Sequence, residues 1–262
     1  MQLRYSLADL NQDGYFQVLR RQDVACTAHL HYSMEYLYVT AGTVILSTGD
    51  GERTVGQGEG TFLASWQRHA YRTPDHSQAV ILLFSPGLTE RFAARLRDFQ
   101  PEREVVQPPA DLMAWLLARL PAGEDAAGPD DPVAAKALLY PLCADFLRDN
   151  PLTARPPRRE ETMQRALQYL GEHAGEPLTL AATARQLGVN PVYLSQAFTA
   201  FTGMRFTECL NTFRVMRACD LLRESDLPVS AVAFEAGFGS LRTFNRVFAE
   251  KTGDTPRRFR CR

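Results

Sequence analysis

Two histidines and a glutamate stand close together near the amino end of the chain, in the pattern His29-x-His31-x-x-x-Glu35. If this segment is extended, the three side chains lie on one face, because successive side chains of a strand alternate between faces. Imidazole and carboxylate groups gathered in this way can hold a divalent ion such as Fe, Mn, Ni or Zn. They can equally hydrogen-bond a small polar molecule or one another, so the residue types leave both interpretations open.

A second set of chemically useful side chains lies near the carboxyl end, inside an internal repeat. The offset between the two units is 49 residues at their start and 50 at their end, so the second turn holds one extra residue. Each unit is predicted to be a short helix, a turn and a second helix. The matching residues are Ala184, Gly188, Leu194, Phe198 and Gly203 in the first unit, and Ala233, Gly237, Phe244, Phe248 and Gly253 in the second.

Local signals predict where these helices begin and end. Thr179 can cap a helix that stops at Gly188, because glycine adopts the left-handed conformation without a steric penalty. Asn190 can cap the next helix, with Pro191 at its first position, and Ser240 is the equivalent cap in the second unit. Two short helices joined by a tight turn indicate a helix-turn-helix, whose second helix enters the major groove of DNA.

The residues between the two units predict one longer helix. Phe206, Leu210, Phe213 and Met216 recur on one helical face within residues 206–222. A helix of this length spans roughly 25 Å at ~1.5 Å per residue. Such a helix can hold two reading helices about one DNA turn apart, ~34 Å. One chain would then read two neighbouring grooves.

Residues 163–260 resemble the DNA-binding domain of the AraC/XylS family of bacterial transcription regulators. The resemblance runs through both units and the helix between them, and it implies a protein that binds double-stranded DNA. The residues that carry it are Pro177-Leu178-Thr179, Pro191, Tyr193-Leu194-Ser195, Phe198, Gly203, Arg214, Ala218 and Leu221-Leu222, followed by Ala233, Glu235, Gly237-Phe238, Phe244, Arg246, Phe248, Gly253 and Thr255-Pro256.

The resemblance places the base-reading side chains on the exposed faces of the two second helices. Arginine there can pair with guanine, and asparagine or glutamine with adenine, whereas valine offers only contact with a thymine methyl. Flanking residues would contact phosphates, which position the protein without reading sequence. The implied readers are Val192, Ser195, Gln196, Arg242, Asn245 and Arg246, and the implied phosphate contacts are Asn190, Ser240 and Lys251.

Three positions depart from the family pattern. In the first reading helix, Gln196 and Thr199 stand where the family usually has an arginine followed three residues later by a lysine. Ala249 replaces a lysine that is common in the second reading helix. We therefore expect weaker attraction to the DNA backbone from both helices and less guanine reading by the first.

The amino-terminal pattern of His29, His31 and Glu35 is similar to the first cupin motif, and His69 stands where the second motif has a histidine. Cupins are small antiparallel barrels that cradle a ligand. The sensor domains of the regulator family share this scaffold. The resemblance implies that these four residues and Trp66 contact a small effector, with no metal and no other cofactor. The alternative is a divalent metal held by His29, His31, Glu35 and His69.

Patterning along the chain predicts the elements that position these residues. Short apolar runs bounded by glycine, aspartate and proline predict strands up to about residue 86, including a hairpin turn at 49–51. Helical spacing predicts helices within 88–99, 112–120 and 135–146, with an exposed loop over 121–132. The prolines of 150–159 predict a linker, because proline removes backbone donors and blocks helix formation.

These elements predict an α+β chain of two domains. We expect a cupin-like, effector-sensing β-barrel with flanking helices over residues 1–100. A helical dimerisation region and linker follow over 101–155, and their apolar stripes can alternatively pack only on their own barrel. An all-α DNA-binding domain with two helix-turn-helix units occupies 156–262.

Composition agrees with a globular DNA-binding chain. The 262 residues are 45% hydrophobic and 23% charged, which argues against wholesale disorder. The net charge of −1 hides an asymmetry, because residues 155–262 hold 16 basic and 11 acidic side chains. The five cysteines form no CxxC pair, and neither a membrane span nor a secretory signal is indicated, so a cytoplasmic protein without a membrane partner is expected.

Together these patterns predict a non-enzymatic transcription regulator, and an activator by analogy with the family. Its expected partners are double-stranded DNA, a small-molecule effector, RNA polymerase and a second copy of the chain. One rival hypothesis is a cupin metalloenzyme with a helical appendage, which would hold a transition metal. Another is a scaffold whose helices bind protein instead of DNA.

Overall fold

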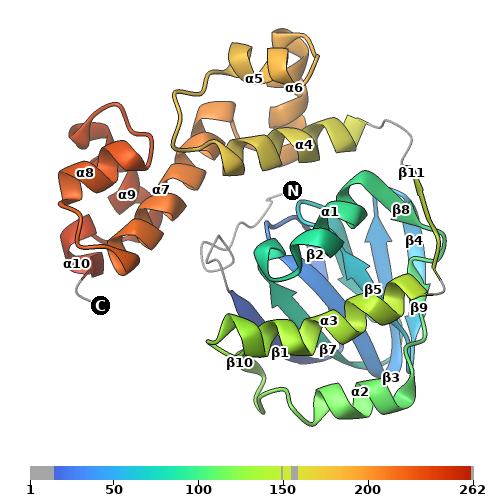
Figure 1. The fold of residues 1–262 in the computed structure, drawn as a ribbon. Helices are drawn as coiled ribbons and strands as arrows, with labels where there is room; N and C mark the ends of the chain where they lie inside the picture. Colours follow the sequence, from blue (N-terminus) through green and yellow to red (C-terminus); the bar gives the residue numbers. More distant parts are fainter. Residues whose placement is uncertain (1–14, 149, 155–158, 261–262) are drawn as a thin grey trace. The chain divides into compact units, whose positions relative to one another are not determined.

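The computed structural model describes residues 15–148, 150–154 and 159–260, and the chain divides near residue 156 into two compact units (Figure 1). The amino-terminal unit combines antiparallel strands with helices, and the carboxy-terminal unit is helical. The predicted α+β fold class is therefore confirmed. Residues 101–154 belong to the amino-terminal unit.

The strands of the amino-terminal unit form a nine-stranded antiparallel sheet that curls into a half-barrel. Its main path runs β10-β1-β7-β3-β5-β9, while β4 and β6 pair with β3, and β2 pairs with β6. The apolar runs before residue 86 therefore form strands as predicted. The strands of this sheet are β1 (Phe16–Gln22), β2 (Cys26–His29), β3 (Met34–Thr48), β4 (Gly51–Gly56), β5 (Gly60–Leu63), β6 (His69–Arg72), β7 (Ser77–Phe84), β9 (Val105–Val106) and β10 (Asp125–Ala127).

Strand β3 serves both halves of the curled sheet. Its first half pairs with β5 and β7, and its second half pairs with β4 and β6. Between the halves, the pairing with β7 shifts register between Val39 and Ala41, and Gly42 follows with a φ of +72°. Such an irregularity bends a strand and increases its twist, which lets one strand contribute to two sheet segments.

The predicted hairpin is confirmed at the end of β3. Thr48 pairs with Gly51, so Gly49 and Asp50 form a two-residue turn between β3 and β4. Gly51 has a φ of +114°, a conformation that only glycine adopts without strain.

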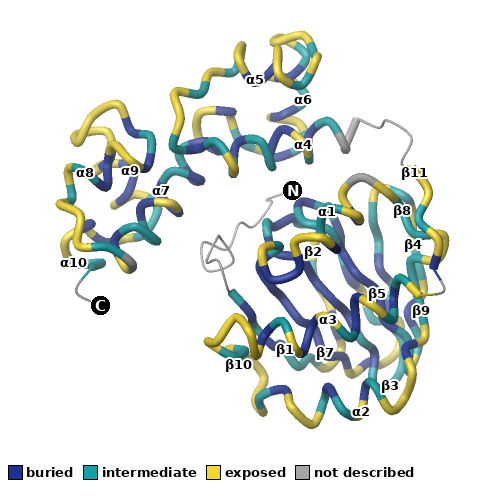
Figure 2. Tube along the Cα trace, in the orientation of Figure 1, coloured by how far each residue is buried: buried dark blue, intermediate teal, exposed yellow. Residues whose placement is uncertain are grey.

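Alternation along β3 separates two apolar cores, and Figure 2 shows that much of this strand is buried. Leu37 and Val39 are buried with side chains of β4, β5, β6 and β7, inside the curl of the sheet. Met34 and Tyr36 are buried on the opposite face, against the helices of this unit. These helices are the short 3-10 turn η2 (Pro86–Thr89), α1 (Glu90–Asp98), α2 (Ala110–Leu117) and α3 (Pro132–Arg148).

Two segments predicted to be irregular contain short strands. The expected loop over 121–132 includes β10, which pairs with β1. The expected linker over 150–159 includes β11 (Leu152–Ala154), which pairs with β8 (Phe99–Pro101). Residues 155–158 of that segment lie outside the described residues. Local composition misses such strands, because their backbone partners lie far away in the sequence.

The carboxy-terminal unit contains the predicted repeat. Helices α5 and α6 form the first helix-turn-helix, α8 and α9 form the second, and α7 joins them. In the described part of the chain, no helix is both long and apolar enough to cross a membrane. The helices of this unit are α4 (Arg159–Glu172), α5 (Leu180–Gln186), α6 (Pro191–Thr202), α7 (Phe206–Glu224), α8 (Val229–Glu235), α9 (Leu241–Thr252) and α10 (Pro256–Arg260).

The second helix of each repeat unit ends with the same hydrogen bond. The hydroxyl of Thr202 donates to the carbonyl of Phe198, and that of Thr252 donates to the carbonyl of Phe248, each at 2.8 Å. The glycine that follows each threonine has a φ of +73°. The repeat found in the sequence is therefore a repeat of backbone geometry.

We predict that two glycine substitutions destabilise different units by different amounts. Gly188→Ala places a Cβ in open space at a φ of +69°, which should cost about 1–2 kcal/mol in the carboxy-terminal unit. Gly42→Ala adds a contact of 2.1 Å between the new Cβ and the carbonyl oxygen of His76, so the loss should be larger.

Urea unfolding measures the two effects separately. Both tryptophans, Trp66 and Trp115, lie in the amino-terminal unit, so their fluorescence reports that unit alone. Far-ultraviolet circular dichroism reports mainly the helical unit. Gly42→Ala should move the fluorescence transition and Gly188→Ala should leave it in place; equal shifts would contradict this assignment.

Candidate nucleic-acid interface and histidine cluster

Helix α6 buries its apolar face and exposes the residues predicted to read DNA. The side chain of Asn190 caps the helix by accepting from the backbone N–H of Val192 at 2.8 Å, and Pro191 occupies the first turn, as predicted. Leu194 and Phe198 are 0% exposed, which confirms them as core residues. The predicted readers Val192, Ser195 and Gln196 are all exposed.

Helix α9 likewise buries its apolar face and exposes its predicted readers. Ser240 caps it by accepting from the backbone N–H of Thr243 at 3.2 Å. Phe244 and Phe248 are buried at 0% exposure. The predicted readers Arg242, Asn245 and Arg246 lie on the exposed face, and the predicted phosphate contact Lys251 is half-buried near the end of the helix.

Arg246 already has a partner on its own helix. Its guanidinium lies 3.2 Å from the carboxylate of Glu250, and both side chains are about two-thirds exposed, at 68% and 64%. An exposed pair of this kind contributes at most about 1 kcal/mol, so it leaves the guanidinium available for a stronger partner. The carboxylate orients Arg246 along the helix surface without burying it.

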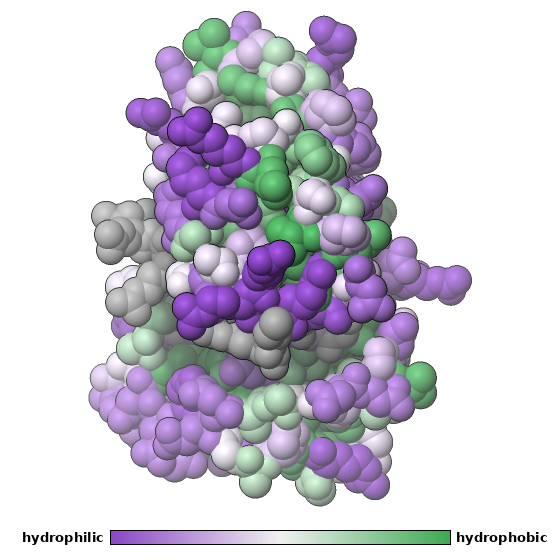
Figure 3. Space-filling model, turned by 90° about the vertical axis from the view of Figure 1, so that its left-hand side faces the viewer, coloured by the Kyte–Doolittle hydropathy of each residue, from purple (hydrophilic) through white to green (hydrophobic). Residues whose placement is uncertain are grey.

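Exposed apolar side chains interrupt the hydrophilic surface of the carboxy-terminal unit, as Figure 3 shows for one side. Val192 is 65% exposed and Leu241 is 39% exposed, and each lies in the first turn of a predicted reading helix. Apolar contacts of this kind suit the methyl group of thymine. Leu241 is the residue that the sequence analysis did not single out.

Two arginines of α7 hold the repeat together. Arg214 donates from Nε to the carbonyl of Ala174 at 3.0 Å and from Nη2 to the carbonyl of Glu176 at 3.1 Å. Arg217 donates from Nε to the carbonyl of Glu235 at the end of α8, also at 3.0 Å. Desolvation lowers the pKa of Arg214. Arg214, one of the family motif residues, is therefore structural.

We predict that Arg214→Ala destabilises the helical unit by about 1–3 kcal/mol, because two backbone carbonyls lose their hydrogen-bond donor. Arg242→Ala removes the same charge from an exposed side chain and should change stability by less than about 0.5 kcal/mol. Urea unfolding followed by circular dichroism compares the two variants. Equal losses would show that the two carbonyl contacts contribute nothing.

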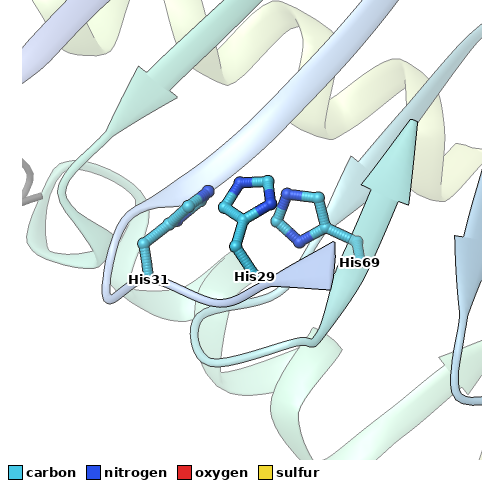
Figure 4. A group of neighbouring side chains, drawn as sticks. All are labelled: His29, His31 and His69. Carbon is cyan, nitrogen blue, oxygen red and sulfur yellow. The ribbon is translucent and has the colours of Figure 1, made fainter. Parts of the chain in front are cut away.

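The histidines predicted in the amino-terminal unit come together in space (Figure 4). His29 ends β2, His31 follows it in the next loop, and His69 begins β6. The ring centroids of His29 and His69 are 4.2 Å apart, and those of His31 and His69 are 5.1 Å apart. One ring nitrogen from each of the three lies within 4.8 Å of the others. These three imidazoles can hold a metal ion.

Glu35 joins the histidines from β3. Its Oε2 lies 3.0 Å from Nε2 of His31 and 3.3 Å from Nε2 of His69, and its Oε1 accepts from the hydroxyl of Tyr71 at 2.5 Å. Burial acts to raise the pKa of Glu35, but the two histidines outweigh it and hold that pKa well below its usual range. Tyr71, on β6, is therefore a further polar partner of Glu35.

The environment keeps His29 neutral near pH 7. Burial and the neighbouring His69 and His31 lower the pKa of His29 to about 4. A neutral imidazole retains a lone pair on one nitrogen, so it can bind a metal or accept a hydrogen bond.

Trp66 is hydrogen-bonded to the loop that carries His31. Its indole is 2% exposed, and its backbone N–H donates to the carbonyl of His31 at 2.8 Å. Its φ is +62°, an uncommon conformation for a side chain of this size. The ring lies 5.8 Å from that of Tyr32, so Trp66 is packed into the unit, and its contact with an effector stays a prediction.

Comparison with known proteins matches two family models, one in each unit. Residues 11–143 match the AraC-like ligand binding domain, and residues 183–262 match a helix-turn-helix domain. These segments contain the histidine cluster and most of the helical repeat.

Similar individual proteins are found as well. The HTH-type transcriptional activator RhaS of Klebsiella pneumoniae is 25% identical over 240 residues, which span 88% of this chain and 86% of RhaS. The C-terminal domain of AraT, a response regulator from Geobacillus stearothermophilus, is 31% identical over 40% of this chain and 88% of that domain, with a TM-score of 0.37. The structure of ToxT from Vibrio cholerae is 12% identical over 94% of this chain and 98% of ToxT, with a TM-score of 0.45.

Proposed function

Because this chain belongs to the AraC family of DNA-binding transcription regulators, we propose that it activates transcription when a small molecule binds in its amino-terminal barrel. The direction of regulation follows the RhaS relatives, which are named as activators. A protein of this kind acts on chromosomal DNA in the cytoplasm, with RNA polymerase as a further partner.

One observation carries the DNA-reading assignment. Two helices built on the same repeat bury their aromatic residues and expose polar side chains at equivalent places, as Phe198 and Phe248 illustrate. Packing alone requires only the buried face. The exposed faces carry the donors and acceptors that base edges require, including Gln196, Asn245 and Arg246. Asn190, Ser240 and Lys251 are proposed to contact phosphates beside them.

The two reading helices are proposed to enter successive major grooves. Helix α7 has 19 residues and therefore spans roughly 28 Å at ~1.5 Å per residue, slightly less than one DNA turn of ~34 Å. Specific binding should fall steeply as salt concentration rises, because phosphate contacts release counterions.

We predict that Arg246→Ala weakens binding to a mapped operator by about 1–3 kcal/mol, or roughly 5- to 150-fold, and relaxes the preference at one base position. Fluorescence anisotropy with operator duplexes substituted at single base pairs measures both effects. Arg165→Ala is the matched control, because Arg165 is an exposed arginine on α4, outside the reading helices. Unchanged operator affinity in Arg246→Ala would remove α9 as a base-reading helix.

The effector is proposed to contact His29, His31, Glu35 and His69, which gather on the inner side of the half-barrel beside the apolar cluster of β3. Trp66 is proposed to contribute to the same site. A thermal-shift screen of small polar molecules tests this proposal, because a ligand that binds only the folded state raises the unfolding temperature.

The chain is proposed to act as a homodimer through α3. The apolar stripe of α3, which includes Leu138 and Leu142, packs on its own barrel, so a dimer contact must use another face. Val133 and Tyr140 are the large hydrophobic side chains of this helix that stay exposed, at 73% and 46%.

We predict that Tyr140→Arg converts the dimer to a monomer while leaving the fold intact, because a charge replaces apolar area at the proposed contact. Sedimentation velocity measures the change in mass. The control is Arg91→Ala, because Arg91 lies on the exposed side of α1, away from the proposed contact on α3. Tyr32 is not used as a control, because its ring packs on Trp66. A wild-type chain that sediments as a monomer would contradict the proposed assembly.

A further inference from the structure

The two reading helices differ in charge although their backbones repeat each other. None of residues 186–204, which include the whole of α6 and the turn before it, is acidic, basic or a histidine. In the second unit, α9 carries Arg242, Arg246 and Lys251 against a single acidic side chain, Glu250. The reading helix of the first unit is therefore neutral, whereas that of the second has a formal charge of +2.

The helix that follows each reading helix shows the same difference. Both α7 and α10 begin three residues after the glycine that ends the reading helix. At their second and third positions, α10 has Arg257 and Arg258. At the same positions α7 has Thr207 and Glu208, and all four residues are exposed. The surface next to α9 is therefore basic where the equivalent surface next to α6 is not.

The absence of charge narrows the range of base pairs that α6 can favour. Guanine presents two acceptors to the major groove, and arginine or lysine pairs with both of them. Helix α6 has neither residue, whereas Gln196 can pair with adenine and Val192, at 65% exposure, can contact a thymine methyl. On α9, Arg246 occupies the place of Gln196, at an offset of 50 residues. Arg242 likewise occupies the place of Val192, and both arginines are exposed.

We propose that the two reading helices bind unequal half-sites of one operator. Helix α9 binds a guanine-containing half-site with the help of its charge, and α6 reads A·T pairs in the other half-site through contacts that depend little on salt. Attraction to phosphates does not distinguish sequences, so α9 contributes to the binding of any duplex. The neutral helix contributes only where the base sequence fits it, so α6 supplies selectivity. This inference rests on the proposed DNA-binding function and names the kind of DNA that the chain selects.

The test uses the full chain and the duplexes that it selects from a randomised pool, with binding followed by fluorescence anisotropy. Arg246→Gln and Gln196→Arg are reciprocal exchanges at equivalent, exposed places, so neither should disturb the fold. We expect Arg246→Gln to change the preferred base at one position of the first half-site from guanine to adenine. Gln196→Arg should make the opposite change in the other half-site.

Salt dependence gives a second readout on the same duplex. Between about 50 and 200 mM salt, each phosphate contact that is lost reduces the fall in affinity by ~3.5-fold, because the logarithmic slope becomes shallower by ~0.9. Lys251→Gln should show this change, whereas Gln196→Ala should weaken binding and leave the slope as it is. Thr199→Lys places a cation on the exposed side of α6 and should steepen the slope by ~0.9. Arg165→Ala, outside the reading helices, is the control that should leave the slope unchanged.

Replacing a single thymine by uracil removes only the methyl group that Val192 is proposed to contact. Uracil at that position of the α6 half-site should weaken binding by the wild-type chain about 4-fold, the effect of burying one methyl group. Val192→Ala should bind the thymine and uracil duplexes almost equally.

The outcomes separate this inference from the proposed function. A chain that selects no duplex sequence contradicts the proposed function, and the inference falls with it. A chain that selects a duplex but prefers guanine in both half-sites overturns the inference alone. The same holds if Gln196→Ala flattens the salt dependence as much as Lys251→Gln, or if Thr199→Lys leaves it unchanged, because α6 would then not be a neutral helix facing DNA.

Discussion

Period-two alternation along one long strand is the constraint on which the amino-terminal unit depends. Strand β3 pairs with β4, β5, β6 and β7, and its two faces supply both apolar cores. Glu35 stands between Met34 and Tyr36, so its side chain must point to the face opposite theirs. Their burial against the helices therefore directs the carboxylate toward the inside of the curl, where His31 and His69 meet it.

In the carboxy-terminal unit, too, the burial of one face fixes the direction of the other face, here with the period of a helix. Phe198 and Phe248 occupy equivalent places in α6 and α9, and each is completely buried. A helix whose aromatic face is anchored in this way has only one remaining orientation for its polar face. The packing of these aromatic residues thus orients the proposed readers, and Arg214 joins α7 to the segment after α4 through a hydrogen bond.

The two units differ in whether their proposed functional side chains are exposed or buried. The helical unit exposes its proposed functional side chains, so their environment changes little from that of an isolated helix. The barrel places Glu35 among its histidines, and this environment lowers the pKa values of Glu35 and His29. A small molecule that enters the barrel meets groups with shifted pKa values, whereas DNA meets an ordinary polar surface.

The sequence by itself determined the elements whose signals are local. Caps at Asn190 and Ser240, the hairpin before Gly51 and the repeated helices were predictable because each depends on residues a few positions apart. Tertiary structure alone decided the pairing of β10 and β11, the hydroxyl of Tyr71 on Glu35 and the structural role of Arg214. Each of these joins groups distant in the chain, and no local pattern encodes which distant backbone or side chain will supply the partner.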